Sequence, residues 1–161
     1  MLEFFGEYGG RSFGSRMTHA AIHNSAVRVL VVDDYEPWRQ RICSSTLRWM
    51  PHALVVEASD GLEAVRKASE LNPDLVLLDI GLPRLNGIEV AHRLCKTVPN
   101  SKILFLTQEA DAEVARAALS NGAKGYVLKA DAGRELLPAI EAVLRGEKFV
   151  SSGIQDEIAT Q

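Results

Sequence analysis

The sequence has few cysteines and aromatic residues and no long hydrophobic run, and each shortage excludes a class of protein. Its two cysteines, Cys43 and Cys95, lie outside any metal-ligand spacing, so a zinc site and a disulfide framework are disfavoured. We expect both to be buried, reduced thiols. No segment approaches the about 18 consecutive apolar residues of a membrane span, and the N-terminus lacks the features of a signal peptide. The sequence therefore predicts a cytoplasmic protein without membrane contact.

An excess of positive charge is also missing. The chain has 18 Lys and Arg against 21 Asp and Glu, a formal net charge of −3 and a pI near 5.8. Domains that bind DNA usually carry a basic face. We therefore expect no direct contact between this chain and nucleic acid.

The patterns that are present predict one folded domain with short appendages. Residues 1–25 are rich in Gly, Ser and His, lack periodicity and are expected to form a flexible tail, with Met17 as an alternative start. Residues 26–148 form the predicted domain. Residues 149–161 are predicted to be a tail or the beginning of a linker.

Five short apolar runs indicate β-strands that are buried on both faces. The runs span residues 27–32, 53–56, 75–78, 103–106 and 126–128. An apolar stripe with helical spacing follows each run, and strand–helix alternation of this kind predicts an α/β fold with a parallel sheet and helices on both faces.

Turn and cap residues mark several expected helix ends. Pro37 suits the first turn of the first helix, whereas Asn72 and Asn121 precede the breaks after the second and fourth helices. Pro138 falls inside the last helix, where it should remove one hydrogen bond and cause a kink.

Reactive side chains follow four of the five predicted strands. Asp33 and Asp34 follow the first, Asp79 the third, Thr107 the fourth and Lys129 the fifth. Because ligands of an open parallel sheet bind beyond the carboxyl ends of its strands, we expect these side chains to meet. The second strand lies at the sheet edge and need not contribute.

This set of residues points to phosphoryl transfer. Three adjacent carboxylates repel one another unless a cation lies among them, and Mg²⁺ suits a site of carboxylates, waters and phosphate. One carboxylate can then attack phosphorus, with Lys129 and Thr107 binding the phosphoryl oxygens. Singly, an Asp-Asp pair is more often a turn or helix cap and a Lys a solvated charge. Because all of these residues are expected at one edge of the sheet, the phosphoryl-transfer site is favoured over these separate roles.

Four segments resemble the receiver domains of bacterial two-component response regulators. They are residues 29–37, 73–87, 103–107 and 122–129. The resemblance covers about residues 27–150 and implies a flavodoxin-like (βα)5 fold with five strands in the order 2-1-3-4-5.

The resemblance also implies a metal site at the phosphoacceptor. Asp79 would accept the phosphoryl group, Asp34 would bind Mg²⁺ directly and Asp33 would hold it mainly through water. The backbone carbonyl of Gly81 would complete the metal site.

The remaining roles that the resemblance implies concern the switch. Lys129 would pair with the phosphoryl group. Thr107 would be the switch hydroxyl, and Tyr126 the aromatic residue that moves inward as Thr107 shifts. Gln108 stands where a small residue is common, so we expect it to narrow access to Asp79 and slow phosphoryl exchange; Glu109 would orient or repel the attacking water.

The loop after Lys129 is similar to that of the NarL/FixJ (LuxR-type) subfamily, because Ala130 replaces the proline of many receivers. Such proteins usually continue into a helix-turn-helix domain, for which no room remains before Gln161. We expect a receiver without its output domain, phosphorylated by a sensor histidine kinase, controlling transcription through the absent domain and dimerising on phosphorylation. A stand-alone relay or phosphate sink is the alternative.

Two other classes fit the sequence less well. An aspartate-nucleophile phosphatase would carry a second acid two residues beyond Asp79, where Gly81 stands, so we expect no enzyme activity on external substrates. A constitutive binding module would have lost one or more residues of the site.

Overall fold

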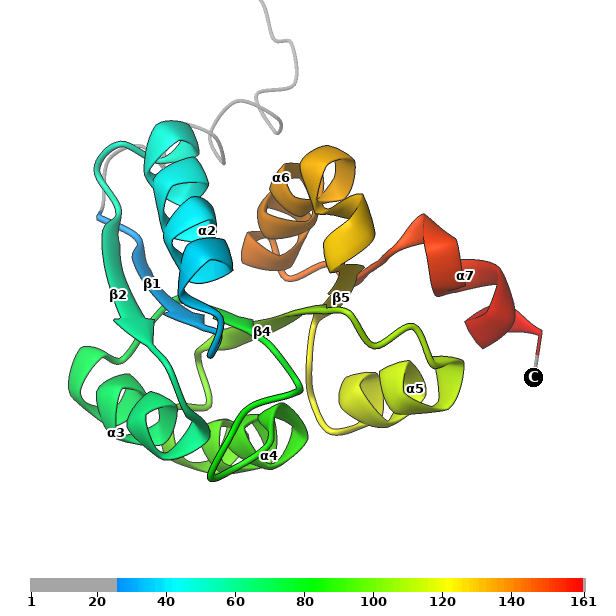
Figure 1. Ribbon diagram of the computed structural model, residues 1–161, viewed down its shortest axis with the longest axis horizontal. Helices are drawn as coiled ribbons and strands as arrows, with labels where there is room; N and C mark the ends of the chain where they lie inside the picture. Colours follow the sequence, from blue (N-terminus) through cyan, green and yellow to red (C-terminus); the bar gives the residue numbers. More distant parts are fainter. Residues whose placement is uncertain (1–25, 161) are drawn as a thin grey trace, which may run out of the picture.

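The computed structural model describes residues 26–160, which fold around a parallel six-stranded sheet (Figure 1). The strands are β1 (Arg28–Val32), β2 (Leu54–Ala58), β3 (Leu75–Leu78), β4 (Lys102–Thr107), β5 (Gly125–Leu128) and β6 (Phe149–Val150). Their order across the sheet is β2-β1-β3-β4-β5-β6. The predicted α/β flavodoxin-like fold, with the order 2-1-3-4-5 for its first five strands, is confirmed.

Helices cover both faces of the sheet, as predicted. They are α2 (Glu36–Trp49), α3 (Gly61–Leu71), α4 (Gly87–Thr97), α5 (Ala112–Ser120), the 3₁₀ turn η1 (Lys129–Asp131), α6 (Ala132–Leu144) and α7 (Ser152–Ala159). Helices α2 and α6 lie on one face, and α3, α4 and α5 lie on the other (Figure 1). Within residues 26–160, no helix has the length and apolar character needed to cross a membrane.

The predicted count of five strands is wrong, because β6 extends the sheet beyond β5. The amide of Phe149 donates to the carbonyl of Lys124 at 3.0 Å, and the amide of Ser151 donates to the carbonyl of Tyr126 at 2.8 Å. Two residues are too few to show a strand pattern in the sequence. Helix α7 follows, and its Ile154 is buried in the same cluster as Tyr126. The predicted tail of residues 1–25 falls outside the described residues.

Local signals set the helix ends as predicted. Pro37 lies in the first turn of α2, and Asn72 ends α3 in the left-handed conformation with a φ of 49°. Gly122, with a φ of 101°, follows α5. Pro138 lies inside α6, and the kink expected there stays a prediction.

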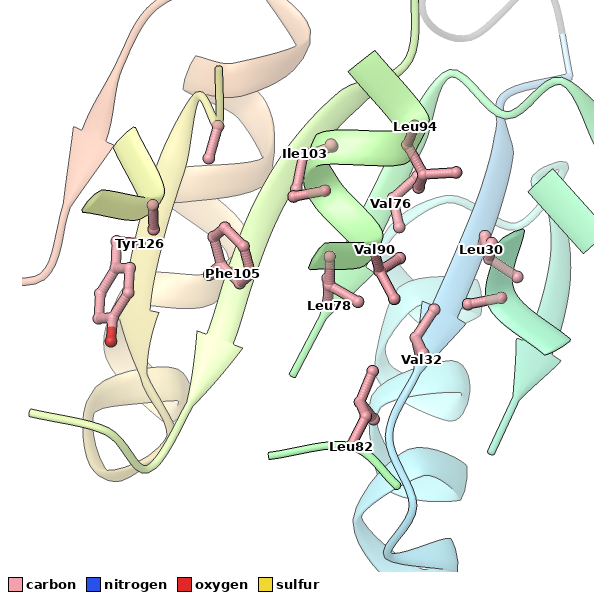
Figure 2. Close-up of a cluster of buried hydrophobic side chains, with 14 of the residues drawn as sticks. Leu30, Val32, Val76, Leu78, Leu82, Val90, Leu94, Ile103, Phe105 and Tyr126 are labelled. Carbon is pink, nitrogen blue, oxygen red and sulfur yellow. The ribbon is translucent and has the colours of Figure 1, made fainter. Parts of the chain in front are cut away.

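Two apolar layers hold the central strands, one on each face of the sheet. Alternate residues of β1 divide between them, with Leu30 in the layer under α3 and α4 and Val31 in the layer under α2 and α6. Figure 2 shows the first layer, in which Phe105 and Tyr126 lie beside each other. Burial of one large apolar side chain contributes about 1.5–3 kcal/mol to the free energy of unfolding. The two layers together therefore hold the ends of the central strands in place.

The expectation that both cysteines are buried is wrong for Cys95. Its side chain is exposed at the end of α4, with Sγ donating to the carbonyl of Asn121 at 3.4 Å. Cys43 is half-buried in α2, and burial raises the pKa of its thiol to about 11. Both cysteines are free thiols, as predicted.

Candidate functional site

The carboxyl ends of the central strands bring the predicted residues together. Asp33 follows β1, Asp79 follows β3 and Thr107 ends β4, while Lys129 follows β5. One carboxylate oxygen from each of Asp33, Asp34 and Asp79 lies within 4.8 Å of the others. A cavity of about 610 Å³ opens here, lined by Asp34, Tyr35, Trp38, Asp79, Ile80, Gly81, Thr107, Gln108, Glu109 and Lys129.

Lys129 links two of the three carboxylates. Its Nζ lies 2.6 Å from Oδ2 of Asp33 and 3.2 Å from Oδ2 of Asp79. Asp33 and Asp79 are only 3% and 8% exposed, so their charges need this compensation. Asp34 differs because its side chain is exposed to solvent. A divalent cation that approaches the cluster would therefore meet Asp34 first.

The surroundings of Asp33 suit a carboxylate that is held in place by the backbone. Its Oδ1 accepts from the amide of Tyr35 at 2.9 Å, and Arg39 donates to its carbonyl at 2.7 Å. Burial raises the pKa of Asp33, although the hydrogen bonds from Lys129 and Tyr35 oppose that effect.

Two backbone contacts fix the position of Asp79. Its amide donates to the carbonyl of Val32 at 3.0 Å, and its Oδ1 accepts from the amide of Ile80 at 2.8 Å. Gly87 begins α4 directly against this turn, where a Cβ atom would lie 2.1 Å from the carbonyl oxygen of Asp79. Close packing of α4 therefore requires glycine at position 87. Gly81, the predicted carbonyl ligand, is exposed and lines the cavity.

Thr107 and Tyr126 both bind the backbone of Glu109. The hydroxyl of Thr107 accepts from the Glu109 amide at 3.3 Å, and the hydroxyl of Tyr126 donates to the Glu109 carbonyl at 2.7 Å. Tyr126 is completely buried, with its ring centroid 6.1 Å from that of Phe105 (Figure 2). Burial, reinforced by nearby carboxylates, raises the pKa of Tyr126 well above its usual range, so the phenol remains a donor.

Two aromatic residues of the site escaped the sequence analysis. Tyr35 and Trp38 line the cavity, and the Trp38 ring lies beside Lys129 with 5.5 Å between Nζ and the ring centroid. Their place at the site could have been expected, because a helix that starts at Glu36 has its first turn next to the end of β1. Gln108 and Glu109 are exposed and line the cavity, and the roles expected of them stay predictions.

Comparison with known proteins identifies the fold family. A family model described as the response regulator receiver domain matches residues 29–141. The chain belongs to this family. Receiver domains are signalling proteins rather than metabolic enzymes, and the predicted resemblance is confirmed.

The similar proteins include transcriptional regulators. The transcriptional regulatory protein LiaR of Bacillus subtilis is 34% identical over 136 residues, which are 84% of this chain and 64% of LiaR. A putative transcriptional regulator of Pseudomonas aeruginosa is 40% identical over 134 residues, which are 83% of this chain and 64% of that protein. This receiver thus spans less than two thirds of the length of these relatives.

Solved receivers have the same fold. A LuxR-family two-component response regulator from Aurantimonas aligns with a TM-score of 0.79 and 36% identity, over 84% of this chain and 96% of that one. The receiver domain of the putative response regulator NarL from Mycobacterium tuberculosis gives a TM-score of 0.70 and 28% identity, over 76% of this chain and 99% of that one. The predicted NarL/FixJ (LuxR-type) resemblance is therefore supported by both sequence and structure.

Proposed function

We propose that this receiver domain accepts a phosphoryl group on Asp79 from a sensor histidine kinase and changes conformation to control an output. The observation that carries the proposal is the ion pair between Asp79 and the largely buried Lys129, with the carboxylates of Asp33 and Asp34 close by. Asp34, Asp79 and Lys129 line one open cavity. Buried acids crowded in this way are costly to keep and suit a site that neutralises them during its reaction.

The proposed reaction is attack of a carboxylate oxygen of Asp79 on phosphorus. The P–N bond of the phosphohistidine breaks with its electron pair going to the imidazole, and a new O–P bond forms on Asp79. Lys129 lies 3.2 Å from Oδ2 of Asp79 and would donate to the phosphoryl oxygens as negative charge gathers there. The hydroxyl of Thr107 would donate to another phosphoryl oxygen.

The donor set suits Mg²⁺. Carboxylates of Asp33, Asp34 and Asp79 are hard oxygen donors within 4.8 Å of one another, and the carbonyl of Gly81 would add a neutral oxygen. When bound, Mg²⁺ would offset the repulsion among the acids and stabilise charge on the phosphoryl oxygens. Lys129 would then be released from Asp33 to bind the phosphoryl group.

The proposed switch passes through the loop between β4 and α5. Thr107 and Tyr126 hold the amide and the carbonyl of the same residue, Glu109. Movement of the Thr107 hydroxyl toward Asp79 would therefore release the Glu109 amide and disturb the anchor of Tyr126. The result would be a shift between two conformations.

The output would lie outside this chain. Relatives named as transcriptional regulators extend well beyond the matched region, so we expect a DNA-binding domain to read the switch. This receiver would itself contact the kinase in the cytoplasm, and a second copy on phosphorylation, but not nucleic acid.

The test is exposure to acetyl phosphate with Mg²⁺, followed by intact-mass measurement and peptide mapping. We expect one added phosphoryl group, located on Asp79 and absent without Mg²⁺. The Asp79→Asn variant is the control and should gain nothing. A label on any other residue would overturn the proposal.

A further inference from the structure

Trp38 lies beside Lys129 and is not among the site residues predicted from the sequence. The ammonium nitrogen lies 5.5 Å from the centroid of the indole ring, within the distance of a cation–π contact. Only 11% of the Lys129 side chain is exposed, so water screens this contact little. Trp38 also lines the cavity that contains Asp79.

Packing, rather than hydrogen bonding, holds the Trp38 ring. Trp38 packs against the apolar cluster under α2 and α6, and its buried Nε1 has no hydrogen-bond partner within residues 26–160. Arg41, one turn further along α2, places its Cζ 5.7 Å from the same ring centroid. The ring is thus a packed surface beside the ammonium group of Lys129.

A packed surface matters because Lys129 must change partners. Its ammonium group has three N–H donors, and Asp33 and Asp79 account for two contacts. A lysine side chain has a flexible four-carbon stem and a strongly hydrated ammonium group, so Lys129 could turn toward the solvent while it changes partners. An aromatic face beside the ammonium keeps it near Asp79 and lowers the cost of orienting it toward a phosphoryl oxygen.

We propose that Trp38 is a positioning residue that holds the Lys129 ammonium within reach of the phosphoryl group on Asp79. The inference rests on the proposed function and adds to it a residue outside the proposed metal ligands and phosphoacceptor. Its ring, rather than its apolar volume, is the property that acts.

The kinetic test compares three variants with the parent protein. Trp38→Leu keeps an apolar side chain but loses the ring, and should lower the rate of phosphorylation by acetyl phosphate about fivefold to thirtyfold. Trp38→Phe keeps a ring and should remain within about threefold of the parent. Trp49→Phe, at the far end of α2, is the matched control and should not change the rate. Circular dichroism checks the fold of each variant.

A spectroscopic test examines the contact itself. Trp38 and Trp49 are the two tryptophans of the chain, so in the Trp49→Phe protein all tryptophan fluorescence comes from Trp38. Adding Lys129→Met to this protein should shift the Trp38 emission in the absence of any phosphodonor. This measurement also decides the case if Trp38→Leu fails to fold.

The outcomes separate the two proposals. Failure of the parent protein to take up phosphate would overturn the proposed function. Normal uptake by a folded Trp38→Leu variant, or an emission that Lys129→Met leaves unchanged, would overturn only the role of Trp38. The role of Trp38 is supported if Trp38→Leu takes up phosphate slowly, Trp38→Phe does not, and Lys129→Met shifts the emission.

Discussion

At the residue scale, Glu109 matters through its backbone, which forms hydrogen bonds with the side chains of both Thr107 and Tyr126. Its amide and carbonyl bind Thr107 and Tyr126, so neither hydroxyl can move without changing the environment of the other. Fold families are recognised by side chains, and a backbone link of this kind is visible only in three dimensions.

The Tyr126→Phe variant tests this link. Loss of the hydroxyl leaves the Glu109 carbonyl without its 2.7 Å hydrogen bond, and we expect the free energy of unfolding to fall by about 1–2 kcal/mol. Urea unfolding measures the change. The phosphoryl group should still reach Asp79, so loss of uptake would show that Tyr126 acts in transfer rather than in the switch.

Gln108 supports a second prediction at this scale. Its exposed side chain lines the cavity that contains Asp79, where it should restrict the approach of water. We expect Gln108→Ala to shorten the lifetime of the phosphoryl group by about threefold or more, as expected for loss of part of a water-excluding contact. Release of inorganic phosphate measures the lifetime, and the hypothesis fails if the lifetime does not change.

At the scale of elements, the approach of α4 to the end of β3 positions the phosphoacceptor. Gly87→Ala would place a methyl group 2.1 Å from the carbonyl oxygen of Asp79, and we expect it to cost about 1–3 kcal/mol of stability and to slow phosphorylation. Gly133→Ala is the matched control, since its Cβ meets nothing within 4 Å and alanine favours the helix. Thermal unfolding compares the two, and equal midpoints would contradict the expectation.

One carboxylate adds to the contacts that hold the C-terminal elements β6 and α7 against the domain. Glu135 of α6 accepts hydrogen bonds from both hydroxyls of Ser151 and Ser152, and Ser151 also accepts from the amide of Leu128 at 3.1 Å. Burial alone would raise the pKa of Glu135, but the hydrogen bonds from Ser151 and Ser152 outweigh it, so the pKa is lowered.

This pKa predicts how the attachment depends on pH. An acid whose pKa is lower in the folded state stabilises that state above its unfolded value of 4.5, and the contribution is lost as the pH falls through the folded value. We expect residues 149–160 to exchange amide hydrogens faster under acid conditions. In the Glu135→Gln variant, the amide hydrogens of residues 149–160 should exchange equally fast at neutral and acidic pH, after correction for intrinsic exchange rates. A pH response that this variant retains would assign the effect to another group.

For the whole molecule, we expect the acidic cluster of Asp33, Asp34 and Asp79 to make stability depend on divalent cations. A ligand that binds only the folded state adds about 2.7 kcal/mol when its concentration is one hundred times its Kd. We expect Mg²⁺ to raise the thermal midpoint of the parent protein. Asp34→Asn should remove most of the gain while leaving the metal-free midpoint nearly unchanged, because Asp34 is exposed. A thermal midpoint that does not change when Mg²⁺ is added would contradict the proposed metal site.

The sequence alone determined the central sheet and the set of residues at its edge. Apolar runs record which strands are buried on both faces, and the residue after each run must emerge at the carboxyl end. Asp33, Asp79, Thr107 and Lys129 could therefore be placed together before any coordinates were known.

Only the tertiary structure decided the features that depend on neighbours distant in the chain. Strand β6 is too short to show a period, and it forms because the edge of β5 offers unpaired backbone groups. The exposure of Cys95 and the contact of Trp38 with Lys129 likewise follow from how α2, α4 and α6 pack. Periodicity specifies which face of an element is buried, whereas packing decides which side chains meet there.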